Sequence, residues 1–220
     1  DGITTKLRAQ GKTVGIVAID PTSPFTGGAI LGDRIRMTRH SLDEGVFIRS
    51  MATRGHLGGL TCATSDAVTI LDALGRDVII IETVGVGQDE VDVVKTAHSS
   101  VVILVPSLGD DIQAMKAGIL EIADLFLINK ADLDGASRLA AEIDMMLDLS
   151  ERRTDWRPPV QKTIGSTGAG LDETLEAIGR HREFLLDSSA INSFNRRRGE
   201  WELLGLLREH LTDFVLRDLL

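Results

Sequence analysis

Cysteine and aromatic residues are scarce in this chain of 220 residues. Cys62 is the only cysteine, so no disulfide can form within the chain and no cysteine cluster is available for zinc or an iron–sulfur centre. Tyrosine is absent and aromatic residues make up only 4%, so the core must be built from Ile, Leu, Val and Ala. Such a core suits a parallel sheet that is buried on both faces. The single cysteine also fits a reducing compartment, and we expect a cytoplasmic protein.

Long hydrophobic runs and an excess of positive charge are missing as well. No apolar run reaches the ~18 residues of a membrane span. The balance of 24 Lys and Arg against 33 Asp and Glu gives a net charge of −9, which argues against a general binder of nucleic acid or of anionic membranes. We therefore expect neither nucleic acid nor a membrane among its partners. A single phosphate ligand remains compatible, because a nest of backbone N–H groups can bind an anion inside an acidic protein.

Short apolar runs alternate with amphipathic stretches as far as about residue 180. The predicted strands are 14–19, 46–48, 78–81, 101–105, 125–128 and a weaker one near Val160. The predicted helices are 4–10, 35–41, 61–74, 90–97, 112–121, 136–147 and 171–186. This alternation predicts βαβ units with right-handed crossovers, hence an open, mostly parallel α/β sheet flanked by helices. Ligands of such sheets bind beyond the carboxyl ends of the strands, so the residues that directly follow each strand are the functional candidates.

The stretch Asn129-Lys130-Ala131-Asp132 follows the predicted strand 125–128 and matches the NKxD pattern that reads guanine. The Asp132 carboxylate can accept two hydrogen bonds from the ring N–H and the exocyclic amine, which adenine does not offer in that arrangement. A site left with unpaired polar groups rejects the wrong base by roughly 10⁴-fold or more. Asn129 can bond the ring edge, and the stem of Lys130 can cover the face of the base. The alternative is a helix start at which polar residues follow the strand by chance.

Glu82 and Gly85 follow the predicted strand 78–81 in a stretch that matches the γ-phosphate sensor of GTPases, with Glu in place of the commoner Asp. The acid can hold Mg²⁺ through water, and Gly85 lets a backbone N–H approach the terminal phosphate. Both are therefore candidate catalytic residues. The alternative is an ordinary glycine-rich turn between a strand and a helix.

Two aspartates lie in or before a long, polar, glycine-rich loop, which is uncommon unless the loop has a function. Asp20 directly follows the strand 14–19, and Asp33 comes near the end of the loop. Together with Glu82 they are the candidates for the metal and phosphate neighbourhood. For Asp33 the alternative is an N-cap of the helix that starts near Ile35.

The turn Ser166-Thr167-Gly168 follows the weak strand near Val160. It lies where GTPases present a backbone N–H to the guanine carbonyl, so these three residues are further candidates for nucleotide binding. A turn without any function is an equally good interpretation of this stretch.

The segment from 192 to 220 contains no strand pattern but has an apolar stripe at helical spacing, formed by Trp201, Leu204, Leu207, Leu211 and Phe214. The stripe is wide enough to need a partner surface. We therefore expect a catalytic domain over 1–187 and a helical dimerisation arm over 188–220. The alternative is that the helix folds back on the sheet of its own subunit.

Taken together, these motifs resemble the MeaB/ArgK family of GTPases over nearly the whole chain. The stretches that carry the resemblance are 20–33, 82–88, 109–118, 129–132 and 156–160. The resemblance implies a P-loop NTPase-type fold, GTP and GDP as ligands, Mg²⁺ dependence and a homodimer built partly by the C-terminal arm. It also implies a chaperone that gates adenosylcobalamin loading and protects methylmalonyl-CoA mutase or a related cobalamin-dependent acyl-CoA mutase. The loop 107–116 would be a switch that relays the nucleotide state to the mutase, with Lys116 as a further candidate catalytic residue.

One departure from the family pattern is that no G-x-x-x-x-G-K-[ST] occurs in the chain. That loop cradles the β- and γ-phosphates and holds Mg²⁺. In the family it lies immediately before the helix that residues 1–10 resemble. We therefore expect a GTPase domain without its first strand and P-loop, which alone is inactive.

Two other functions fit the same fold. A nickel- or cobalt-insertion GTPase usually carries Cys or His clusters, whereas the five histidines here are scattered. A non-catalytic interaction module would use the fold without nucleotide chemistry. The coding sequence upstream of Asp1 would distinguish that module from a GTPase.

Overall fold

The structure, a computed structural model, describes residues 1–20, 38–52, 59–83, 96–106, 119–150, 155–188 and 190–219. The chain divides into two units. The first unit comprises 1, 3–97 and 192–220, and the second comprises 2 and 98–191. Each unit has its own parallel sheet and its own hydrophobic core.

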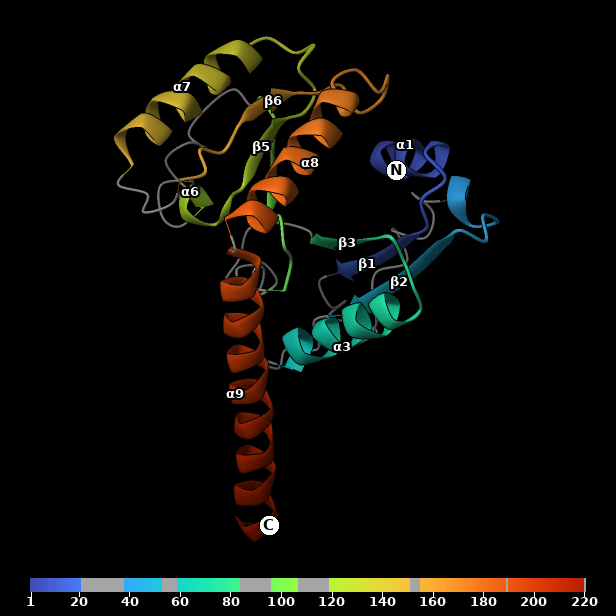
Figure 1. The fold of residues 1–220 in the computed structure, drawn as a ribbon, viewed down its shortest axis with the longest axis vertical. Helices are drawn as coiled ribbons and strands as arrows, with labels where there is room; N and C mark the ends of the chain where they lie inside the picture. The colour runs from blue at the N-terminus through green and yellow to red at the C-terminus, as the bar shows by residue number, and fades with distance from the viewer. Residues whose placement is uncertain are drawn as a thin grey trace. The chain divides into compact units, whose positions relative to one another are not determined.

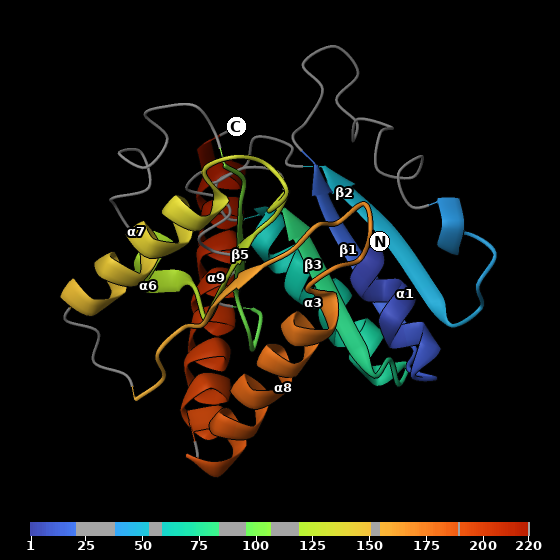
Figure 2. The same cartoon turned by 90° about the horizontal axis from the view of Figure 1, so that it is seen from above.

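The first unit is built on a three-stranded parallel sheet in the order β2-β1-β3. Its elements are α1 (Gly2–Ala9), β1 (Val14–Asp20), the short 3₁₀ helix η1 (Thr38–His40), β2 (Val46–Ala52), α3 (Gly59–Ala73) and β3 (Val78–Thr83). The three strands lie side by side in Figure 2, and Figure 1 shows α1 and α3 on opposite faces of the sheet. Val17 and Ile19 of β1 are buried together with Leu71 of α3, which fastens α3 to the sheet.

The second unit repeats this plan with the strand order β4-β5-β6, again parallel. Its elements are β4 (Val101–Leu104), α6 (Ile119–Ile122), β5 (Leu125–Ile128), α7 (Ala136–Leu149), β6 (Val160–Lys162) and α8 (Leu171–Asp187). All four residues of the central strand β5 are buried. Because side chains alternate across a strand, Phe126 and Ile128 pack in the cluster that includes α7, and Leu125 and Leu127 pack with Ala177 of α8. The helices α7 and α8 therefore cover opposite faces of the sheet (Figure 1).

The last helix, α9 (Ala190–Leu219), combines polar contacts to α3 with exposed leucines. Glu202 accepts hydrogen bonds from the Ser65 hydroxyl of α3 and from Arg198, and Arg198 donates to the Thr69 hydroxyl at 3.4 Å. Trp201, directly before Glu202, is half-buried. The same part of the helix carries five leucines that are each between 50% and 63% exposed, namely Leu203, Leu204, Leu206, Leu207 and Leu211.

The predicted architecture is confirmed, since each predicted strand is present and the sheets are parallel and flanked by helices. Residues 90–95 of the predicted helix 90–97 and residues 112–118 of the predicted helix 112–121 lie outside the described residues. Among the helices that the structure does describe, none is both long and apolar enough to cross a membrane.

Candidate functional site

A cavity of about 300 Å³ opens at the carboxyl end of β5 in the second unit. Two segments form it, one directly after β5 and the other shortly after β6. Its lining residues are Asn129, Lys130, Asp132, Leu133, Ile164, Gly165 and Ser166. The site thus lies beyond the carboxyl ends of parallel strands, where the fold class places ligands.

The loop after β5 is held in a demanding backbone conformation. Lys130 has a φ of 54°, which makes it the non-glycine residue with positive φ in the described part of the chain. Hydrogen bonds fix the backbone around it: the Asn129 N–H donates to the Leu104 carbonyl at 2.8 Å, and the Ala131 N–H donates to the Thr163 carbonyl at 3.0 Å. A left-handed lysine costs on the order of 1–3 kcal/mol and persists only where its surroundings enforce it. Such strain concentrates at functional sites.

A side-chain bond joins the two segments that form the cavity. Oδ1 of Asn129 accepts a hydrogen bond from the Gly165 N–H at 2.9 Å, and the Thr163 hydroxyl lies 3.5 Å from the same oxygen. The bond orients the Asn129 amide and leaves its Nδ2 group as a hydrogen-bond donor. Asn129 therefore links the two loops through Oδ1 and keeps a donor group on Nδ2.

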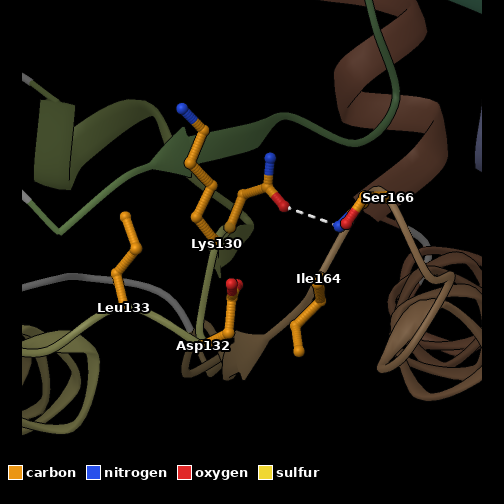
Figure 3. Close-up of a pocket in the computed structure, with 7 residues that line it drawn as sticks. Lys130, Asp132, Leu133, Ile164 and Ser166 are labelled. Atoms are coloured by element: carbon orange, nitrogen blue, oxygen red, sulfur yellow. Dashed lines mark hydrogen bonds between the residues drawn. The ribbon is translucent and has the colours of Figure 1, made fainter.

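The charges and apolar groups of the cavity suit a planar ring with polar edges. Figure 3 shows the Asp132 side chain between those of Leu133 and Ile164. Asp132 and Lys130 are exposed, so both can meet a ligand from solvent. The carboxylate supplies two acceptors, the asparagine amide supplies a donor, and the aliphatic side chains supply contact area. This set can hold a heterocyclic base whose edge presents N–H groups to Asp132.

The turn after β6 closes the cavity and starts α8. The Thr167 and Gly168 N–H groups both donate to the Ile164 carbonyl, at 3.1 and 2.9 Å. These two amides are therefore used inside the turn, whereas Ser166 lines the cavity. Of the three residues predicted here for nucleotide binding, Ser166 lies beside Asn129, Lys130 and Asp132, and Thr167 and Gly168 shape the turn that presents it.

The other candidates belong to the first unit or fall outside the described residues. Glu82 lies near the end of β3, opposite Ala18 of β1, and Asp20 ends β1, so both are at the carboxyl edge of that sheet. The side chain of Asp20 is not among those described, and the candidates Asp33, Gly85 and Lys116 lie outside the described residues altogether. Across the described ranges, no three His, Cys, Asp or Glu side chains gather as a metal site would require.

Four residues of the site were missed by the motif-based prediction: Leu133, Thr163 and the pair Ile164 and Gly165, which directly precedes the predicted Ser166. Leu133 lines the cavity, and Thr163 receives the Ala131 N–H and faces Asn129. Leu133 has a local signal, since it is the apolar residue directly after Asp132. Thr163 has none, because its contacts join segments more than thirty residues apart in sequence.

Comparison with known proteins identifies the family of the chain. A protein-family model described as "Methylmalonyl Co-A mutase-associated GTPase MeaB" matches residues 1–218. A Pyrococcus horikoshii protein named as a GTPase is 54% identical over 210 residues, which is 94% of this chain and 66% of that protein. The Mus musculus protein named "Methylmalonic aciduria type A homolog, mitochondrial" is 36% identical over 211 residues, which is 94% of this chain and 51% of that protein.

A solved structure has a similar fold. A crystal structure described as a LAO/AO transport system kinase superposes with a TM-score of 0.73 at 26% identity, and the match covers 99% of this chain and 64% of that one. The predicted fold of the P-loop NTPase type is thereby confirmed. This chain spans no more than 66% of the length of any of these three proteins. On the match of the family model over nearly its whole length, the chain belongs to the MeaB family of methylmalonyl-CoA mutase-associated GTPases.

Proposed function

We propose that the cavity beyond β5 binds the base of GTP or GDP and that this chain is part of a GTP-hydrolysing protein. The observation that carries the proposal is that one cavity collects Asn129, Lys130, Asp132 and Ser166, each of which the sequence assigned to guanine nucleotide binding. In this assignment Asp132 accepts from the ring N–H and the exocyclic amine, Asn129 donates to the ring edge, and the Lys130 stem covers the base. The names of the family and of its Pyrococcus relative as GTPases support it.

We assign binding of Mg²⁺ and the phosphates to residues at the carboxyl edge of the sheet β2-β1-β3. Carboxylate oxygens are the ligands that Mg²⁺ prefers, so Glu82 and Asp20, with Asp33 of the following loop, would hold the ion, which would neutralise charge on the β- and γ-phosphates. We assign Glu82 to the γ-phosphate side because it is the last residue but one of β3, at the carboxyl edge of that sheet. Gly85 would bring a backbone N–H to the terminal phosphate.

The biological role that we propose is that of a chaperone for a cobalamin-dependent acyl-CoA mutase, methylmalonyl-CoA mutase or a relative of it. The description of the family and the name of the mouse relative support this partner. The chaperone would gate adenosylcobalamin loading and protect the mutase, and Lys116 of the switch loop would relay the nucleotide state. Residues 188–220 would form a homodimerisation arm next to a GTPase domain over 1–187. The cytoplasmic location expected from the single cysteine stays a prediction.

Two alternatives remain open to the same test. A metal-insertion GTPase needs a cluster of metal ligands, and the described part of the chain contains no such group. A non-catalytic interaction module would have the cavity without a preference for guanine.

The proposal is tested by titrating the protein with GDP, ADP and CDP while backbone amide resonances are recorded by NMR. We expect GDP to shift the amides of 129–133 and 164–166 at concentrations at which ADP and CDP leave them unchanged. Equal shifts with GDP and ADP, or none with any nucleotide, would contradict guanine recognition and favour the interaction module.

A further inference from the structure

A buried histidine lies at the end of the second unit that is opposite the cavity. His181 of α8 is only 4% exposed. Its Nδ1 lies 2.8 Å from the Ser99 hydroxyl, and its Nε2 lies 3.6 Å from Oδ1 of Asp124. The histidine thus connects α8 to the residues that precede β4 and β5.

Aromatic rings surround the imidazole. The centroids of the Trp156 and His181 rings are 4.8 Å apart, and those of Trp156 and Phe184 are 5.4 Å apart. The Trp156 Nε1–H donates to the Asp124 carbonyl at 2.8 Å, and the Asp124 carboxylate accepts from the Ser100 N–H at 2.8 Å. We call Ser99, Asp124, Trp156, His181 and Phe184 the His181 cluster. Its members come from four separate parts of the second unit, so the contacts fix how these parts pack.

The His181 cluster and the cavity are joined by the same two elements. β5 leads from Asp124, directly before its first residue, to Asn129, directly after its last. α8 begins at Leu171, a few residues after Ser166, and runs to the cluster. The position of α8 against β5 at His181 therefore acts together with the bond between Asn129 and Gly165 on the distance between the Ser166 turn and the Asp132 loop.

We propose that the His181 cluster is a positioning device for the guanine cavity and that protonation of His181 releases it. This inference rests on the proposed function, because the cavity is taken to be the guanine site. No residue of the His181 cluster lines the cavity. The cluster acts through α8 and β5.

The charges around the ring decide the direction of the effect. Burial lowers the pKa of His181, and the Coulomb field of Asp124, the ionised group that faces the ring, opposes this shift without outweighing it. Ser99, Trp156 and Phe184 are uncharged, and Arg180 on the same helix is exposed and lies 4.0 Å from Glu176. In the neutral tautomer that carries its proton on Nε2, the nitrogen that faces Asp124, Nδ1 accepts a hydrogen bond from the Ser99 hydroxyl. Protonation turns Nδ1 into a donor and forces that hydroxyl to turn away.

The sign of the pH dependence follows from the lowered pKa. The unfolded chain has a histidine pKa of about 6.5, and the folded pKa lies below it. The contribution of the neutral ring is therefore fully present above about pH 6.5, and it is lost as the pH falls through the folded pKa. Guanine nucleotide affinity should decrease over the same range.

Trp156 reports on the cluster directly, because an imidazolium quenches indole fluorescence at this distance. In a Trp201→Phe background Trp156 is the only tryptophan. We expect its emission to fall on acidification from pH 8 to 5, the transition to be absent in His181→Gln, and the transition to persist in His210→Gln. Glutamine can still bond Ser99 but cannot become charged. Ser99→Ala is a second variant that keeps His181 and removes only its hydroxyl partner. It should shift the pH midpoint of the Trp156 fluorescence transition.

The same proteins are then titrated with GDP at pH 7.5 and pH 5.5. Between pH 7.5 and pH 5.5, GDP affinity should fall on the order of fivefold more in the protein that keeps His181 than in the His181→Gln variant. This factor lies in the range of typical coupling between two sites. A folded Trp201→Phe protein without a fluorescence transition would overturn the titrating device. A fluorescence transition with equal pH dependence of GDP affinity in both proteins would overturn the positioning role. Absence of GDP binding at every pH would instead refute the proposed function, and the positioning role with it, while the fluorescence transition remained.

Discussion

At the scale of single residues, Gly170 decides where α8 begins. Its φ is 78°, and a Cβ built on it would lie 2.0 Å from the Lys162 carbonyl oxygen. A side chain would therefore face both a left-handed backbone and a collision with main chain that cannot move independently. Gly170 directly follows the antiparallel bridge between Ile164 and Ala169 in the cavity turn.

Gly170→Ala should lower the free energy of unfolding by about 2 kcal/mol or more. Gly179→Ala is the matched control, because Gly179 lies within α8 and a Cβ there meets nothing within 4 Å. Alanine at that helix position should stabilise by roughly 0.5–1 kcal/mol. Urea unfolding of the two variants measures both changes, and a Gly170→Ala protein as stable as Gly179→Ala would refute the conformational argument.

The residues of the site could be predicted where the signal is local. Asn129, Lys130 and Asp132 form a continuous motif after a buried strand, and all three line the cavity. The hydrogen bond between Asn129 and Gly165 joins residues 36 positions apart in sequence, so no local sequence pattern predicts it. Thr163 was missed for the same reason.

At the scale of helices and strands, β5 and α9 show what hydrophobic patterning can and cannot specify. The continuous apolar run 125–128 predicts a strand buried on both faces, and β5 is such a strand. α9 is apolar on more than one side. A stripe that joins Trp201 with Leu204 and Leu207 therefore fits the helical period, yet Trp201 is half-buried while both leucines are exposed.

The contact between α9 and α3 depends on Glu202. The substitution Glu202→Ala removes the hydrogen-bond acceptor of the buried Ser65 hydroxyl. It also removes the carboxylate to which Arg198 donates. We expect amide hydrogen exchange in the first half of α9 to accelerate by on the order of tenfold, as loss of one such bond implies. Glu200→Ala is the control, since Glu200 is exposed and pairs with Arg196 on the same helix. Equal exchange in the two variants would show that Glu202 does not fasten α9.

The exposed leucines of α9 are the surface on which we expect the proposed homodimer to form. Burial of each leucine contributes roughly 1.5–3 kcal/mol before ordering costs, so several together favour association. Leu207→Glu combined with Leu211→Glu should give a folded monomer in sedimentation equilibrium. Leu149→Glu, at an exposed leucine of α7, should leave the dimer intact. A monomeric unsubstituted protein, or a dimer that survives the double substitution, would contradict this surface.

At the scale of the whole molecule, turnover should depend on Glu82. Its proposed role, a metal-linked acid beside the γ-phosphate, has its largest effect when charge develops in the transition state. In the protein that hydrolyses GTP, Glu82→Ala should lower kcat by roughly 10²-fold while nucleotide affinity changes little. Parallel measurement of kcat and of the GDP dissociation constant separates the two effects. A loss of affinity with kcat unchanged would make Glu82 a binding residue only.

The central claim is that Asp132 reads guanine, and exchanging the base tests it most directly. In Asp132→Asn the amide places a donor where the carboxylate accepted, so GDP affinity should fall at least about tenfold and XDP affinity should rise. Asp134→Asn is the matched control, because Asp134 is exposed in the same turn and does not line the cavity. Calorimetric titration of both variants with GDP and XDP is the measurement. A switch from GDP to XDP in Asp132→Asn alone is the predicted result, and unchanged GDP affinity in that variant would contradict the account.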